Sequence, residues 1–586
     1  MDYYKPRTDD MRFLLETFGY DEVQALPGNS DYDIDTVSAV LEEGAKVLVN
    51  EFLPLNSVGD RVGLEFNPET GAVTTPPGFK KAWKAFSENG LAGLHHSMEY
   101  GGSGVPYMAS VLLGEVTTAT NKSLSMCPGL TAGLSEAIAH HGSEEQKSYY
   151  LPKLISGEWS GTMCLTEPQC GTDLGLVSTK AVEYGDHFKL TGNKIWISFG
   201  EHDLCDNIIH LVLGRLPGAP EGIKGISCFI VPKKLEDGTL NGIKCTGLEH
   251  KMGIKASPTC VMSMEDAEGW LIGEPHRGMR TMFVMMNSAR LEVGLEGMAM
   301  SEAAYQAAVA YARDRRQSRS LDKAKRDMNA KADVILVHPD VRRMLANVKS
   351  TTEGMRALVA WTGKQSDIAH GHPDDARRKN AADLLALLTP IVKSFCTERG
   401  FLNISEAMQV CGGAGYTQDW PIEQLMRDER IAMIYEGTNH IQALDLVGRK
   451  LPQGGGRLVR AFAAEVTSTI KDYKDDDRMA EFIAPLKEAS KTLTAITMEL
   501  GQKGMKDPEE VAAVASNYLN VFALTALALV WTRMVGRTIE QRTRFEKTKV
   551  KTGRYFMANI LPEIHTLVAL VRAGKQHMMA FDEDEF

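Results

Sequence analysis

The chain has 586 residues, more than one hydrophobic core usually supports, and this length predicts roughly three or four domains. Its 43% hydrophobic and 24% charged residues are typical of a folded protein and exclude a disordered or fibrous one. The formal net charge of -11 argues against nucleic acid as a partner, because phosphate binding draws on a basic surface.

The spacing of the cysteines and the length of the apolar runs indicate the cellular compartment of the protein. The nine cysteines are scattered, without a CxxC pair or a Cys/His cluster, so we expect reduced thiols and no metal site. The start, MDYYKPRTDDMRFLLETFGY, has no apolar core of signal-peptide length and is acidic, which disfavours a transit peptide and predicts a cytoplasmic location. The longest apolar run, Val521 to Trp531, is about half the length that crosses a bilayer, so we expect a buried helix and no membrane partner.

The first part of the chain follows a helical pattern and then changes to a β pattern. Helical periodicity extends over residues 33–154, with a glycine-rich turn in the middle. Between residues 162 and 274, β-branched runs of strand length predict a small β domain. Within it, HFKLTGNKIWIS is expected to form two strands around a Gly192-Asn193 turn, and NIIHLVLGRL and GISCFIVPKK to form further strands.

Helical periodicity returns after Gly278 and continues to about Leu451. Pro452 and three glycines at 454–456 then predict a linker into a helical extension with an acidic end. The predicted fold class is α+β and mainly α. Its expected parts are an N-terminal extension and helical domain (1–160), a central β domain (161–277), a helical bundle domain (278–451) and a helical C-terminal extension (452–586). The first helix after residue 278 is expected to have one apolar face, formed by Leu291, Leu295, Met298, Ala299, Ala303 and Ala307.

Two polar segments of the β domain are candidates for ligand binding. In CLTEPQCGTDLG, hydroxyl and main-chain N–H groups of Thr166, Gly171 and Thr172 could bind a flavin edge or a phosphate; the alternative is an ordinary loop. In KIWISFG, Trp196 and Ser198 share one face of a strand, where a tryptophan more often belongs to the core.

A third segment, residues 408–442, joins a glycine turn, a charged helix and an apolar run that ends at a lone carboxylate, Glu436. Gly437 and Thr438 are expected to begin the next helix. Taken alone, Glu436 is more often a solvated surface acid than a base. Burial by its apolar flank would raise its pKa, whereas the following helix N-terminus would favour the anion, and the sequence leaves that balance open.

In this order and at these separations, the three segments resemble the acyl-CoA dehydrogenase family over about residues 35–450, most specifically over 409–442. The resemblance implies a helical N-terminal domain, a central β-barrel-like domain and a C-terminal four-helix bundle. It also implies FAD-dependent α,β-dehydrogenation of an acyl-CoA thioester to a trans-2-enoyl-CoA. A homo-oligomer, dimer or tetramer, and an electron-transfer flavoprotein as electron acceptor follow from the same resemblance.

The resemblance also assigns roles to residues. Glu436 would remove the α-proton while flavin N5 takes the β-hydride; the base position of a minority of the family is Ala289 here, which cannot accept a proton. The residues expected to contact FAD are Met163, Leu165, Thr166, Thr172, Trp196, Ser198, Arg315, Gln409, Gly412, Gly413 and Thr438. Of these, Arg315, Gln409, Gly412 and Gly413 would reach the FAD of a neighbouring subunit. Expected substrate contacts are Thr172, Arg290, Tyr435 and Gly437.

Three features of the chain bear on the substrate. The N-terminal YYKPRTDDMRFLLETF segment, a charged insertion at 319–339 that departs from the family pattern, and the C-terminal extension resemble one bacterial subgroup. That subgroup converts 3-(methylthio)propanoyl-CoA (3-methylmercaptopropionyl-CoA) to 3-(methylthio)acryloyl-CoA in dimethylsulfoniopropionate demethylation. Medium- or long-chain fatty acyl-CoA dehydrogenases of β-oxidation share this layout, so a fatty acyl-CoA remains an alternative substrate. Hydrogen peroxide formation would indicate an acyl-CoA oxidase instead, and a colourless protein a non-catalytic scaffold.

Overall fold

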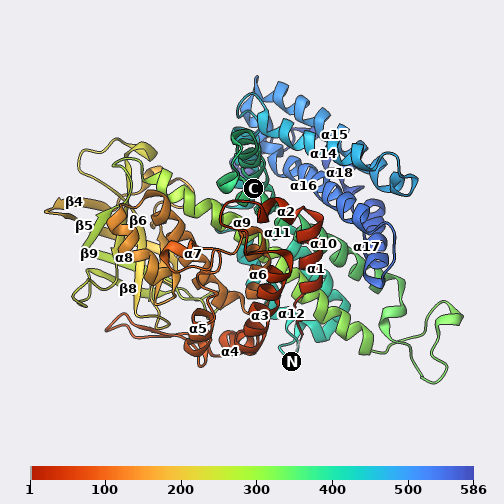
Figure 1. The fold of residues 1–586 in the computed structure, drawn as a ribbon, viewed down its shortest axis with the longest axis horizontal. Helices are drawn as coiled ribbons and strands as arrows, with labels where there is room; N and C mark the ends of the chain where they lie inside the picture. Colours follow the sequence, from red (N-terminus) through yellow and green to blue (C-terminus); the bar gives the residue numbers. More distant parts are fainter. Residues whose placement is uncertain (1–2) are drawn as a thin grey trace. The chain divides into compact units, whose positions relative to one another are not determined.

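The computed structural model describes residues 3–586, which fold into two compact units (Figure 1). Unit 1 comprises Met1–Ala39, Pro106–Glu115 and Val293–Phe586, and unit 2 comprises Val40–Val105 and Val116–Glu292. The division falls inside three long helices, α3 (Ile34–Glu51), α6 (Tyr107–Thr120) and α9 (Gly278–Asp314). Helices dominate and a single larger sheet lies in unit 2, so the α+β, mainly α class is confirmed.

Unit 2 is built on a mixed sheet whose strands run in the order β3-β6-β4-β5-β9-β7, with β8 paired to β9. An additional β6–β7 pairing closes the strands β6, β4, β5, β9 and β7 into a ring, as in a barrel. The strands are β3 (Trp159–Cys164), β4 (Lys180–Tyr184), β5 (His187–Ser198), β6 (Asn207–Arg215), β7 (Ile226–Pro232), β8 (Ile243–Leu248) and β9 (Thr259–Leu271), with a separate β1–β2 hairpin at Glu65–Phe66 and Val73–Thr74.

The strands NIIHLVLGR and ISCFIVP are confirmed as β6 and β7, and both are buried along nearly their whole length, as their continuous apolar runs indicate. The expected turn at Gly192-Asn193 is wrong, because HFKLTGNKIWIS forms the single strand β5. The turn lies earlier, at Gly185-Asp186, where Tyr184 of β4 pairs with His187 of β5. Gly192 instead lies at a register shift against β9, and a Cβ there would come within 2.6 Å of Thr179 Oγ1.

Helices complete unit 2: α4 (Asn56–Val62), α5 (Phe79–Glu88), α7 (Lys122–His141) and α8 (Glu144–Ile155). Asn121 caps α7 by accepting a hydrogen bond from the Leu124 N–H group, and Ser143 and Gln146 form a capping box at α8. Both helices pack against β3. Apolar side chains of α7 and α8 share one core with the β6 residues Ile209, Leu211 and Leu213.

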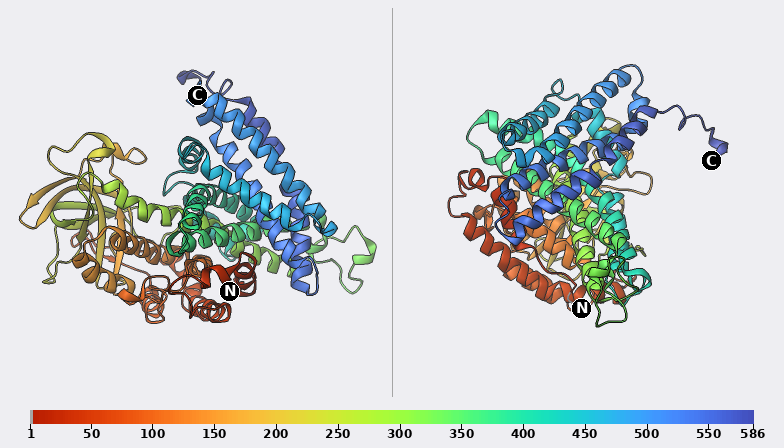
Figure 2. Two further views of the ribbon diagram at one scale, coloured as in Figure 1. Left: turned by 45° about the horizontal axis from the view of Figure 1, so that its top comes forward. Right: turned by 90° about the vertical axis from the view of Figure 1, so that its right-hand side faces the viewer.

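Unit 1 is all helical. Its helices are α1 (Thr8–Thr17), α2 (Tyr20–Gln24), α10 (Pro339–Gly371), α11 (Asp375–Cys411), α12 (Ile422–Glu429), α13 (Asn439–Asp445), α14 (Arg457–Tyr473), α15 (Ala480–Gly504), α16 (Pro508–Thr538), α17 (Arg544–Tyr555) and α18 (Glu563–Ala573), with the ends of α3, α6 and α9. The chain turns at residues 451–456, where a linker was expected, and both sides of this turn belong to unit 1. Helices α14 to α18 lie side by side, and α16 also packs on α10, α11 and α13 (Figure 2).

Helix α16 is the most apolar part of unit 1. Residues 521–531 are buried, which confirms the expected buried helix. By length and composition alone, α16 and the segment Arg544–Ala573 could each cross a bilayer, but 78% of the apolar window of α16 lies inside unit 1. A core helix meets the same criteria.

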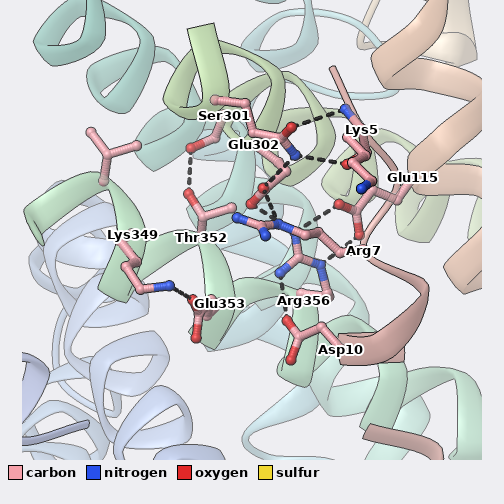
Figure 3. A network of polar contacts seen from close by, with 12 residues as sticks. Lys5, Arg7, Asp10, Glu115, Ser301, Glu302, Lys349, Thr352, Glu353 and Arg356 are labelled. Atoms are coloured by element: carbon pink, nitrogen blue, oxygen red, sulfur yellow. Dashed lines mark hydrogen bonds and ion pairs between the residues drawn. The ribbon is translucent and has the colours of Figure 1, made fainter. Parts of the chain in front are cut away.

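A buried ion network ties distant parts of unit 1 together (Figure 3). The Arg356 guanidinium on α10 donates to Glu115 at 2.6 and 2.7 Å, to Asp10 at 2.8 Å and to Glu302 at 2.8 Å. Lys549 of α17 adds contacts to Asp10 at 2.5 Å and to a carboxylate of α10 at 2.7 Å. The network therefore joins the N-terminal segment, α6, α9, α10 and the C-terminal extension. The charges in such a network stabilise one another. Removing one of them would leave an opposite charge buried and unpaired, which would lower the stability of the fold.

Candidate active site

The candidate flavin loop of unit 2 is organised around Glu167, whose carboxylate is buried. It accepts hydrogen bonds at 2.6–3.0 Å from the main-chain N–H groups and hydroxyls of Ser178 and Thr179. The fully buried Lys194 of β5 donates to Glu167 at 2.8 Å and to the Leu165 carbonyl at 3.0 Å. These bonds fasten both ends of the loop to the strand that carries Trp196.

Electrostatics favour the ionised form of Glu167. Burial alone would raise its pKa, but Lys194 and the hydroxyls of Thr179 and Ser178 outweigh burial and lower the pKa to about 2. Glu167 and Lys194 therefore form a charged pair inside the protein. Glu167 was not among the expected site residues, although its place next to Thr166 in the TEP motif could have indicated it.

Trp196 lies on a bulge in β5. Lys194 pairs with Met262 and Ile197 with Cys260, so β5 contains one more residue than β9 over this stretch. Trp196 has a φ of 63°, a conformation that tryptophan rarely adopts, and its side chain is 56% exposed. The alternative that this tryptophan belongs to the core is therefore wrong. An exposed aromatic side chain held by strained backbone is typical of a ligand platform.

The structure brings Trp196 next to the loop through a hydrogen bond of 2.9 Å from the Ile195 N–H group to the Thr166 carbonyl. The other expected flavin contacts of this unit, Met163, Leu165, Thr166 and Ser198, are partly exposed, and Thr172 is exposed. Arg290 is buried on α9. Accessible hydroxyls, main-chain groups and an aromatic surface on one framework fit a flavin ring and its ribityl chain.

The candidate base lies in unit 1, in a turn between the 3₁₀ helix Arg430–Met433 and α13. Glu436 is partly buried and has a φ of 57°, and Gly437 follows with a φ of 83°. The expected helix start is confirmed, since Thr438 is the N-cap of α13 and its hydroxyl accepts from the Ile441 N–H group at 3.4 Å. Two consecutive left-handed residues, the first of them a glutamate, indicate a conformation that the surrounding structure enforces.

Neighbouring side chains hold this turn. Gln442 donates to the carbonyl oxygens of Glu436 and Gly437, each at 3.1 Å. The fully buried Lys393 of α11 donates to the Gly437 carbonyl at 2.7 Å and to the Asn439 side chain at 3.1 Å. Neither residue was expected to have a role: Lys393 is 44 positions from Gly437, and Gln442, although close in the chain, carries no motif of its own.

Tyr435 precedes the candidate base and is also fixed. Its hydroxyl donates a short hydrogen bond to the carboxylate of Glu296 on α9. Burial, followed by the negative charge of Glu296, raises the pKa of Tyr435 well above its ordinary value. The phenol therefore stays neutral and acts as a donor to Glu296. Within unit 1, the structure thus places the expected site residues Tyr435, Glu436, Gly437 and Thr438 in one supported turn.

The residues expected to reach a neighbouring subunit lie on the surface of unit 1. Arg315, Gln409, Gly412 and Gly413 are exposed. Gly412 ends α11 with φ 56° and ψ −142°, a region that essentially only glycine adopts. The charged insertion folds around Asp333, which accepts from the N–H groups of Ser320 at 2.7 Å and Asp327 at 2.6 Å.

Among residues 3–586, no group of three or more His, Cys, Asp or Glu side chains is arranged to hold a metal ion. The nine cysteines are free thiols.

Comparison with known proteins gives matches along most of the chain. Acyl-CoA dehydrogenase family models match at residues 65–158 (N-terminal domain), 162–267 (middle domain) and 276–451 (C-terminal domain), and an acetyl-CoA dehydrogenase C-terminal-like model matches at 462–582. The 3-methylmercaptopropionyl-CoA dehydrogenase of Ruegeria pomeroyi is 40% identical over 96% of this chain and 97% of its own. A butyryl-CoA dehydrogenase of Syntrophomonas wolfei is 33% identical over 98% of this chain and 96% of its own.

A solved structure agrees at the level of the fold. The crystal structure of an acyl-CoA dehydrogenase complexed with FAD from Bacillus anthracis matches with a TM-score of 0.76 at 24% identity, covering 94% of this chain and 90% of that one. The expected family, fold, enzyme class and cofactor are confirmed. The chain belongs to the acyl-CoA dehydrogenase family and is an FAD-dependent oxidoreductase that acts on acyl-CoA thioesters.

Proposed function

We propose that the enzyme oxidises 3-(methylthio)propanoyl-CoA to 3-(methylthio)acryloyl-CoA, with Glu436 as the base. The observation that supports this substrate most is the 40% identity to the Ruegeria pomeroyi relative over nearly the whole of both chains. A match over 96% of this chain includes most of the C-terminal extension, one of the parts whose sequence resembled this subgroup. The N-terminal segment and the C-terminal extension contribute to the ion network around Arg356, through Asp10 and Lys549.

The chemistry needs a base and a means of stabilising charge. An α-proton of a thioester is only weakly acidic, so the negative charge that develops on the carbonyl oxygen must be met by a hydrogen-bond donor. We assign proton removal to the Glu436 carboxylate and donation to the thioester oxygen to the Glu436 main-chain N–H group. Bound FAD supplies the acceptor for the hydride that leaves the β-carbon. The left-handed conformation of Glu436 would fix the directions of its N–H group and its side chain together.

The proposed contacts follow the sequence prediction. Trp196 would stack against the flavin, and Met163, Leu165, Thr166, Ser198, Thr172 and Thr438 would complete its surroundings. Thr172, Arg290, Tyr435 and Gly437 are proposed to contact the substrate. The exposure of Trp196 supports its place in this set, because a core tryptophan could not contact a cofactor.

Assembly and electron transfer are further parts of the proposal. We infer a dimer or tetramer in which Arg315, Gln409, Gly412 and Gly413 reach the FAD of a neighbouring subunit; their exposure is compatible with such a contact. An electron-transfer flavoprotein would reoxidise the enzyme in the cytoplasm. The four-part division at residues 160, 277 and 451 is proposed as the domain layout, close to the edges of the matched family models.

The test is an anaerobic screen of flavin bleaching with a series of acyl-CoA thioesters. Fastest bleaching is expected with 3-(methylthio)propanoyl-CoA; a preference for butyryl-CoA or longer chains would favour fatty acid oxidation, the second candidate, which the Syntrophomonas wolfei relative supports by its name. Glu436→Gln should keep its FAD yet fail to bleach. Bleaching of that variant at the wild-type rate would refute the assigned base. Hydrogen peroxide production in air would indicate an oxidase, and a colourless protein a scaffold.

A further inference from the structure

The turn that carries Glu436 adopts a conformation that its own sequence does not favour. Glu436 has a φ of 57° and Gly437 a φ of 83°, and a glutamate seldom adopts such a conformation without support from its surroundings. For a base, this geometry sets the direction from which the carboxylate approaches a proton. The residues that impose it are therefore part of the catalytic apparatus even when they do not touch the substrate.

We propose that Lys393 and Gln442 are positioning residues for Glu436, and that proton abstraction depends on them through the backbone of the turn. This inference rests on the proposed role of Glu436 as the base. Neither residue was expected to have a role from the sequence. Both side chains are fully buried, and the Lys393 ammonium and the Gln442 amide nitrogen donate to the turn, whereas the Gln442 side-chain oxygen is buried without a hydrogen-bond partner.

Gln442 determines the orientation of two successive carbonyl groups. Its side-chain amide donates to the Glu436 and Gly437 carbonyls at 3.1 Å each. The two carbonyls must converge on one nitrogen, and rotating Glu436 back into a right-handed conformation would turn its carbonyl away. A Cβ on Gly437 would lie 2.8 Å from the same nitrogen, so Gln442 also requires glycine at that position.

Lys393 fastens the turn to the long helix α11. Its ammonium group donates to the Gly437 carbonyl at 2.7 Å and to the Asn439 side-chain oxygen at 3.1 Å. Asn439 in turn donates to the Ser394 carbonyl at 3.1 Å and accepts from the Thr397 hydroxyl at 3.2 Å. The first residue of α13 and the glycine after the base are thus held to one turn of α11. A bond from a charged donor is stronger than a neutral one, so Lys393 is the stiffest of these supports.

The experiment measures proton abstraction without hydride transfer. A thioester with sulfur in place of the β-carbon, a 3-thia-acyl-CoA, has exchangeable α-protons but no β-hydride to give. Exchange of these protons in D₂O, followed by mass spectrometry on the FAD-loaded enzyme, reports the base alone. Lys393→Met and Gln442→Met are each expected to slow exchange by about 10- to 100-fold, because small misplacements of a base cost rates of this size. Thioester binding, which also draws on the proposed contacts of Thr172 and Arg290, should change less than the exchange rate does.

Matched controls separate positioning from stability. Lys364 on α10 is also buried and donates to the Phe18 and Gly19 carbonyls at 2.7 and 3.1 Å, and the buried Gln365 donates to the Trp361 carbonyl at 3.3 Å. Lys364→Met and Gln365→Met should lower the thermal midpoint and leave the exchange rate of the folded enzyme unchanged. If Lys393→Met and Gln442→Met slow exchange no more than these controls, the positioning role is refuted. If Glu436→Gln exchanges at the wild-type rate, the proposed base itself is wrong.

Discussion

Trp196 in unit 2 and Glu436 in unit 1 are held by similar supports, although their side chains differ in kind. In unit 2, Trp196 has a φ of 63° two residues after the buried Lys194, which donates to the Leu165 carbonyl. In unit 1, Glu436 has a φ of 57° next to Gly437, whose carbonyl accepts from the buried Lys393. In both places a left-handed candidate residue coincides with a buried lysine that donates to a nearby main-chain carbonyl.

The difference lies in what else each lysine binds. Lys194 is paired with the buried carboxylate of Glu167, whereas Lys393 donates to a carbonyl and to the amide of Asn439. Removing one member of a buried ion pair leaves an uncompensated charge, which is far more costly than leaving a neutral acceptor without its donor. The Glu167–Lys194 pair in unit 2 should therefore contribute strongly to the stability of the fold, whereas the bonds from Lys393 to Gly437 and Asn439 hold the turn in unit 1.

The largest effect is expected from Lys194→Met. The buried Glu167 carboxylate would lose its counter-charge, and the free energy of unfolding should fall by about 3–5 kcal/mol. Urea unfolding followed by circular dichroism measures this change. The double variant Lys194→Met/Glu167→Gln removes both charges, keeps an acceptor for the donors of Ser178 and Thr179, and should recover part of the loss. Equal losses in the single and double variants would show that the pairing is not what stabilises this loop.

A smaller loss is expected from Lys393→Met in the same assay. The carbonyl of Gly437 and the side chain of Asn439 would lose a buried donor, which costs about 1–3 kcal/mol. The comparison between the two units predicts that this loss stays below that of Lys194→Met. A loss as large as that of Lys194→Met would show that Lys393 is equally important for folding. The predicted difference between the two units would then be wrong.

Acid should weaken unit 2 through Glu167. Its pKa of about 2 in the folded protein lies below its ordinary value of 4.5, so its stabilising contribution is complete above about pH 5 and is lost as the pH falls from 4.5 towards 2. At pH 3 the loss should reach up to about 2 kcal/mol. Unfolding midpoints at pH 5 and pH 3 measure it, and Glu167→Gln should show a correspondingly smaller drop. Identical pH dependence in both proteins would contradict the assigned cause.

The smallest change in stability is expected from Trp196→Gly. The substitution relieves a strained left-handed residue but adds freedom to the unfolded chain, so the free energy of unfolding of the apoprotein should change by less than about 1 kcal/mol. FAD affinity, measured by fluorescence titration, should fall because the aromatic surface is lost. Trp83, 2% exposed on α5, is the matched control. Trp83→Ala should cost about 3–5 kcal/mol.

Regular parts of the fold were predictable because their pattern is local. The continuous apolar runs of β6 and β7, the apolar α16 and the helix start at Thr438 each follow from neighbouring residues. Gly192 shows where local patterns mislead. A Gly-Asn pair between β-branched runs predicted a turn, yet the glycine is required by the close approach of Thr179, which only the folded sheet reveals.

The candidate residues were found by resemblance, but their geometry was not predictable. The bulge at Trp196 depends on the register between β5 and β9, about 65 residues apart in the chain. The turn at Glu436 depends on Lys393, and Tyr435 depends on Glu296, 139 positions away. Side chains that meet only through tertiary packing leave no periodic signal in the sequence.

The ion network around Arg356 has a consequence for synthesis of the chain. Asp10 is made early, but one of its two cationic partners, Lys549, is made near the end, so at typical ribosomal rates about half a minute to two minutes separate them. During that interval the acidic cluster of Asp10, Glu115, Glu302 and Glu353 lacks part of its counter-charge. Assembly of the helical unit should therefore be completed only after translation has passed α17, which makes the nascent chain dependent on protection from aggregation.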